Sequence, residues 1–92
     1  MKPIELSYKG SRITEAAVYE LRRAAGADEV TKTELANRIG VSRQTVSKRF
    51  RCGDMKLSEF VASAMSLNKN PAELLQQAVK QEEASGTADA SE

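Results

Sequence analysis

The chain lacks histidine and tryptophan, and it contains a single cysteine, Cys52, among its 92 residues. Without histidine it has neither the commonest general base nor the commonest metal ligand of proteins. One cysteine excludes an internal disulfide bond and a cysteine-based metal site. The sequence also has no glycine-rich phosphate loop and no acids paired as a catalytic dyad. We therefore expect a binding protein, not an enzyme, with no metal or other cofactor.

Aromatic residues make up only 4% of the sequence, whereas hydrophobic residues make up 40%. The core must then consist mostly of Leu, Val, Ile, Ala and Met, a mixture that suits packed helices better than a sheet sandwich. No apolar run approaches the roughly 20 residues that cross a bilayer. The first residues also lack the apolar stretch of a secretory signal. We predict a small, all-α, cytoplasmic domain without a membrane partner.

Charge is nearly balanced over the whole chain, with a formal net charge of +1, but it is unevenly distributed. Between residues 43 and 56 a single acid, Asp54, accompanies a group of cations: Arg43, Lys48, Arg49, Arg51 and Lys56. Acids prevail after residue 72. A basic centre beside an acidic end is a local signal for nucleic acid that the average conceals.

Helical periodicity and capping residues predict five helices, at about residues 11–25, 31–39, 43–50, 58–67 and 70–83. Ser11 or Thr14 would cap the first of them, and Gly26 would end it in the left-handed conformation. Residues 1–10 alternate apolar and polar side chains, which predicts a short strand or an extended arm. The small, polar composition of residues 84–92 predicts a disordered tail. The helical domain would then occupy residues 11–83.

Residues 32–50 have the pattern of two short helices that cross at a steep angle. The crossing requires a small residue, which Ala36 provides, and the turn requires a positive φ, which Gly40 adopts without strain. Val41 and Val46 would fill the space between the helices, while Leu35 and Ile39 would hold the pair on the domain. This pattern predicts a helix-turn-helix.

In that frame the start of the second helix projects outward. Ser42 would cap it, and its free N–H groups and positive dipole end suit a phosphate. Arg43, Gln44 and Lys48 would point away from the packed side. Arg pairs with guanine, Gln with adenine, and Lys with guanine or a phosphate, which are the contacts of a major-groove reader. Outside a helix-turn-helix, the same residues would be interpreted as a solvated helix face.

Residues 34–47, ELANRIGVSRQTVS, and the later NPAELL at residues 70–75 carry a resemblance to a known family. Between about residues 20 and 79 the chain resembles the lambda-repressor-like (Cro and repressor, XRE-type) helix-turn-helix regulators of phages and bacteria. The resemblance implies a compact five-helix DNA-binding domain that acts as a homodimer on palindromic operators. By position, it implies base contacts from Arg43, Gln44 and Lys48. It implies phosphate contacts from Lys32, Thr33, Ser42 and Thr45.

The chain departs from the family after this motif. Arg49 stands where the family has an apolar residue, and Phe50 takes over that packing. The glycine that ends the helix arrives only at Gly53. For Arg49 and Arg51, we therefore leave both phosphate contact and simple solvation open.

The function we expect is sequence-specific binding of double-stranded DNA by a phage or prophage repressor. An antitoxin-like autoregulator, a chromosomal regulator and a protein-interaction module on the same helical frame remain alternatives. Because a single domain leaves no room for a ligand-binding unit, any induction would come from a regulatory protein partner or from dilution. Leu75 and Val79 fit either the core or a dimer contact, and Cys52 fits either an incidental residue or a redox-sensing thiol.

Overall fold

The computed structural model describes residues 3–90, with side chains for residues 5–84. Within this part every regular element is an α-helix, which confirms the predicted all-α class. The five helices are α1 (Pro3–Ala27), α2 (Lys32–Ile39), α3 (Arg43–Cys52), α4 (Leu57–Ser66) and α5 (Pro71–Ala90).

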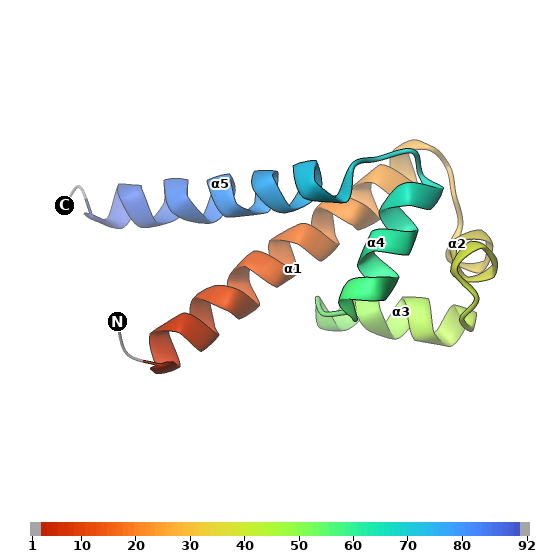
Figure 1. Cartoon of the computed structure of the whole chain (residues 1–92), viewed down its shortest axis with the longest axis horizontal. Coiled ribbons are helices and arrows are strands. Elements are labelled where there is room, and N and C mark those ends of the chain that lie inside the picture. The colour runs from red at the N-terminus through yellow and green to blue at the C-terminus, as the bar shows by residue number, and fades with distance from the viewer. Residues whose placement is uncertain (1–2, 91–92) are drawn as a thin grey trace.

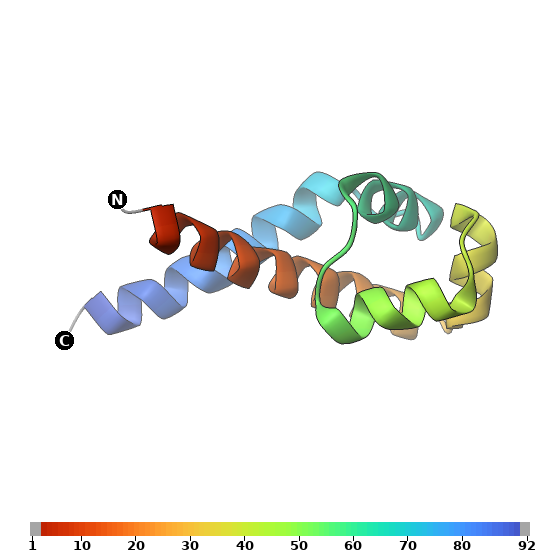
Figure 2. The ribbon, with the colours of Figure 1, turned by 90° about the horizontal axis from the view of Figure 1, so that it is seen from below.

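Two long helices pack together, and the other three helices pack at one end of this pair. Helices α1 and α5 pack against each other and run in opposite directions, while α2, α3 and α4 gather around the C-terminal half of α1 (Figures 1 and 2). The longest dimension of the molecule is 45 Å against 24 and 18 Å for the other two. This elongation follows from the parts of α1 and α5 that extend beyond the other three helices, because a helix of 25 residues is about 37 Å long.

The N-terminal segment is helical where we predicted a strand or an extended arm. Helix α1 begins at Pro3, so that prediction is wrong for residues 3–10, and residues 1–2 lie outside the described part. The alternation of apolar residues buries nothing here, because Leu6 and Tyr8 are 57% and 62% exposed. The described residues offer no strand with which this segment could pair. Extending an existing helix avoids the costly nucleation step, so residues 3–10 continue α1 and do not form a strand.

The predicted ends of the first helix also fail. Thr14 does not cap it but donates its hydroxyl to the carbonyl of Gly10, 2.8 Å away within the helix. Gly26 lies inside α1, and the left-handed conformation occurs three residues later at Glu29, with φ 57°. The later ending lets the Val30 N–H bond the carbonyl of Ala25 at 2.9 Å and places Val30 against the core.

The remaining boundaries agree more closely with the predictions. The Thr31 hydroxyl accepts from the Glu34 N–H and caps α2, and Asn70 Oδ1 accepts from the Ala72 N–H at the start of α5. Helix α3 continues two residues past Phe50 and ends at Gly53, which is left-handed with φ 68°.

Helix α5 runs on to Ala90, through residues 84–90, where we expected a tail. Residues 91–92 lie outside the described part of the chain. The extension has the same cause as at the N-terminus, because a formed helix adds each further residue without a new nucleation step.

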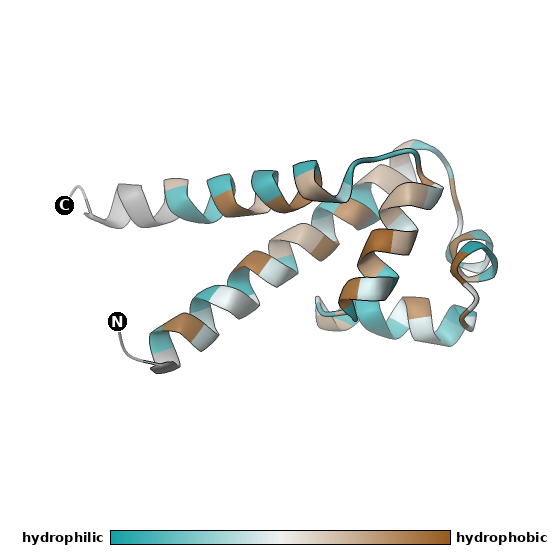
Figure 3. Ribbon diagram, viewed as in Figure 1, coloured by the Kyte–Doolittle hydropathy of each residue, from teal (hydrophilic) through white to brown (hydrophobic). Residues whose placement is uncertain are grey.

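Small residues allow the helices of the main core to approach closely. Leu21 and Phe60 are surrounded there by the buried alanines Ala17, Ala64 and Ala78. Apolar residues recur along each helix in bands separated by polar ones, as the colouring of Figure 3 shows. Among the described helices, none is long and apolar enough to cross a membrane.

Candidate nucleic-acid interface

Helices α2 and α3 pack through a small cluster of their own. Its buried members are Leu35, Ala36 and Val46, which are 0%, 2% and 1% exposed. Gly40 ends α2 in the left-handed conformation with φ 76°, and the N–H of Val41 bonds the Ala36 carbonyl at 3.0 Å. These are the positions that the sequence predicted for the crossing and the turn, and they set the direction in which α3 points.

The outward face of α3 follows from Val46, which faces the core. Gln44, Lys48 and Arg51 are spaced at i, i+4 and i+7, so they form one line on the opposite side of the helix. All three are exposed. Arg43 is exposed too, but it precedes Phe50 by seven residues and so lies on the same side of α3 as Phe50, which packs against both core clusters. Of the base-contacting residues predicted from the sequence, Gln44 and Lys48 therefore lie on one exposed line of α3, whereas Arg43 does not point away from Phe50 as predicted and is exposed because it lies in the first turn of the helix.

Ser47 lies beside this line, and the sequence prediction did not include it among the candidate contacts. It is half-buried and lies one helical turn after Arg43, between the lines of Arg43 and Arg51. Its hydroxyl can both donate and accept a hydrogen bond. The i+4 spacing of Ser47 from Arg43 is the sequence signal that indicates this position.

Ser42 and Thr45 come together at the N-terminus of α3. The Ser42 Oγ accepts from the Thr45 N–H at 3.1 Å and lies 2.9 Å from the Thr45 hydroxyl. The cap thus leaves the backbone N–H groups at N1 and N2 without helical acceptors, at the positive end of the helix dipole. Such a terminus suits an anion.

Lys32 and Thr33 lie in the first turn of α2, apart from Ser42 and Thr45. Thr31, not Thr33, provides the cap there, so the exposed Thr33 hydroxyl is not used as the helix cap. Lys32 is half-buried. An acid in the same turn, Glu34, pairs with Arg38 at 3.8 Å. The predicted phosphate-contacting residues therefore form separate groups on α2 and α3.

Arg49 has a partner within the chain. Its Nε lies 3.0 Å from Oε1 of Glu59 on α4, and the second guanidinium nitrogen lies 3.5 Å from Oε2. The Glu59 side chain is only 12% exposed, and it also accepts the Lys56 N–H at 3.1 Å. This pairing accounts for a cation at a half-buried position of α3. Arg51, in contrast, stays exposed.

The Glu59 carboxyl has a lowered pKa. Burial by itself raises this pKa, but the Lys56 N–H, together with the hydrogen bond and charge of Arg49, outweighs burial and lowers it below 4.5. A lowered folded-state pKa gives stability that is present above the unfolded value and lost as pH falls through the folded one. The pair between α3 and α4 is therefore weakened in acid.

We expect Glu59→Gln to reduce the acid sensitivity of folding. The parent should lose free energy of unfolding as the pH falls through the acidic range, because Glu59 takes up a proton on unfolding, and the variant should lose less. Urea unfolding at several pH values measures the difference. Glu83→Gln, at an exposed site on α5, is the matched control and should follow the parent. If the Glu59 and Glu83 variants share one pH profile, the pairing contributes nothing to stability.

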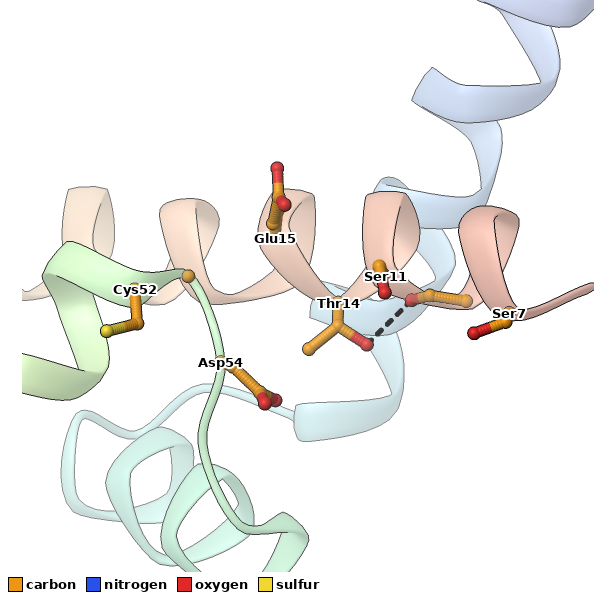
Figure 4. Close-up of a pocket in the computed structure, with 8 residues that line it drawn as sticks. Ser7, Ser11, Thr14, Glu15, Cys52 and Asp54 are labelled. Atoms are coloured by element: carbon orange, nitrogen blue, oxygen red, sulfur yellow. Dashed lines mark hydrogen bonds between the residues drawn. The ribbon is translucent and has the colours of Figure 1, made fainter. Parts of the chain in front are cut away.

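A polar hollow of about 440 Å³ lies where the end of α3 approaches α1. Figure 4 shows the Cys52 thiol and the carboxylates of Glu15 and Asp54 at its edge, pointing in different directions and not toward a common point. Across the described residues, no three metal-ligating side chains of the His, Cys, Asp or Glu type are grouped. The hollow therefore presents no converging set of chemical groups, and the outward face of α3 is the candidate site.

Comparison with known proteins does not identify this interface. The chain matches no protein-family model, no curated protein sequence and no solved structure.

Proposed function

We propose that the chain is a sequence-specific double-stranded DNA-binding regulator that inserts α3 into the major groove. The observation that carries this proposal is the exposed surface of α3, which presents Gln44, Lys48 and Arg51 on its outward line and Arg43 in its first turn, on a helix that contains no acid. Of the cations on α3, only Arg49 has an ion-pair partner within the described residues. The others are available to a ligand rich in negative charge.

The side chains divide by the part of the duplex that each suits. Arg43, Gln44 and Lys48 have the chemistry to read base edges, each good base contact being worth about 1–3 kcal/mol of discrimination. Ser42 and Thr45 with the free N–H groups of α3 suit phosphates, as do Arg51 and the pair Lys32 and Thr33 on α2. Arg49 is a weaker candidate for a phosphate contact because its guanidinium already pairs with Glu59.

The resemblance of residues 34–47 to lambda-repressor-like regulators supports a more specific form of the proposal. The chain would act in the cytoplasm as a homodimeric repressor of the phage or prophage type, on an inverted-repeat operator. Its two α3 helices would enter successive major grooves about 34 Å apart. Repression would be steric, through exclusion of polymerase, and a protein partner would relieve it.

Selection of bound duplexes from a random-sequence DNA library at physiological salt tests this proposal. Recovery of an inverted repeat with a fixed half-site spacing is the expected result. Recovery of a single unpaired half-site would refute the dimer but keep the base reading. Recovery of unselected DNA, or of none, would contradict the proposal and favour an acidic protein surface as the ligand of α3.

A further inference from the structure

A second charged surface adjoins the end of α3. A groove of about 370 Å³ separates this end from the middle of α1. Tyr19 and Arg22 of α1 form one side, and Phe50 and Arg51 of α3 form the other. Because Arg51 also belongs to the outward face of α3, the groove continues the surface that we propose to meet DNA.

The lining of this groove carries more positive than negative charge, and its base is a packed aromatic side chain. Arg22 and Arg51 are both exposed, and neither has an ion-pair partner among the described side chains. Glu15 is the acid in the lining, so the cations outweigh it. Phe50 packs against both core clusters and fixes the base of the groove. Tyr19 is 57% exposed and can offer its hydroxyl as a hydrogen-bond donor.

The length of α3 relates the groove to a duplex. A helix of 10 residues spans about 15 Å, whereas the major groove of B-DNA is about 12 Å wide between its two backbones. If α3 lies across the DNA major groove with its capped N-terminus near one sugar-phosphate backbone, its C-terminus reaches the opposite backbone. Ser42 and Thr45 lie at the first end of α3, and Arg51 with Arg22 lies at the second.

We propose that the groove between α1 and the end of α3 binds a backbone phosphate of the same DNA duplex, with Arg22 as a phosphate-contacting residue. This inference rests on the proposed DNA-binding function and extends its footprint onto α1. A phosphate contact positions the protein without reading sequence. Arg22 therefore contributes equally to operator and to unrelated DNA.

The test compares two neighbouring arginines of equal charge. Arg22→Gln removes a cation from the groove, whereas Arg23→Gln removes one that pairs with Glu20 at 3.6 Å and does not line the groove. Affinity for the selected operator and for an unrelated duplex is measured by fluorescence anisotropy over a salt series. Circular dichroism confirms that both variants fold.

We expect Arg22→Gln to weaken binding to both duplexes by the same factor. Its loss should be about threefold larger at 50 mM than at 200 mM salt, because one neutralised phosphate contributes a slope of about 0.9 in log K against log salt. Arg23→Gln should keep the affinity and salt slope of the parent. Glu15→Gln should act in the opposite direction and strengthen binding, because it removes the acid from the groove.

The outcomes separate this inference from the proposed function. If the parent binds DNA but the Arg22 and Arg23 variants are equivalent, the groove is not a phosphate site while DNA binding stands. A loss confined to the operator would also overturn it, because Arg22 would then act on sequence. If the parent binds no duplex, both proposals fall together.

Discussion

Lys48→Glu is expected to weaken operator binding by about 100-fold or more. The substitution removes one contact of about 1–3 kcal/mol and places a carboxylate against the duplex, so two units of charge change at the interface. Lys48 is exposed on the outward line of α3 and has no ion-pair partner in the described part of the chain, so folding should be preserved. Electrophoretic mobility shift with the selected operator measures the loss.

Lys80→Glu is the matched control for this substitution. Lys80 is exposed on α5, and the change in net charge is the same. We expect its affinity to fall much less than that of Lys48→Glu, because charges separated from DNA by more than a Debye length of about 8 Å are largely screened at physiological salt. Equal losses in the two variants would mean that net charge alone drives binding and that α3 has no special role.

Leu35→Ala is expected to remove about 2–5 kcal/mol of unfolding free energy, the usual cost of a cavity left by a fully buried leucine. Leu35 is 0% exposed and anchors α2 to α3. A domain of 92 residues has about 5–14 kcal/mol in total, so the loss is a large part of its stability. Urea unfolding followed by circular dichroism measures it, and saturating operator should partly restore the midpoint because DNA binds only the folded state.

Leu57→Ala is the control, because it makes the same substitution at an exposed position. Leu57 is 68% exposed, so its truncation should change stability by no more than about 0.5 kcal/mol. A small effect at both positions would show that α2 and α3 do not depend on the cluster around Leu35. The helix-turn-helix would then lack the support that we assign to it.

The helix-turn-helix could be predicted from the sequence because its signals are local. Thr31, Gly40 and Ser42 determine their own surroundings through hydrogen bonds and backbone angles within a few residues of each. The outward positions of Gln44 and Lys48 then follow from helical spacing relative to Val46. For Gln44 and Lys48, the outward side of α3 could therefore be told from its packed side by the sequence alone.

The features that could not be predicted depend on contacts between distant segments. The pairing of Arg49 with Glu59 is set by the angle between α3 and α4, which no spacing rule gives. The groove that joins Arg22 to Arg51 depends on where α1 crosses the end of α3. At the N-terminus, the alternating pattern was too short to exclude a helix. No strand occurs among residues 3–90 with which this segment could pair, so the segment is helical.

The base preference of Gln44→Ala is the most direct test of whether α3 reads DNA from its outward face. Selection of duplexes by this variant and by the parent, in parallel, gives two profiles to compare. Our account predicts a relaxed preference at one position in each half-site, with unrelated DNA bound as by the parent, because Gln44 reads a base and not a phosphate. An unchanged profile, or an equal loss on all sequences, would contradict the placement of α3 in the major groove.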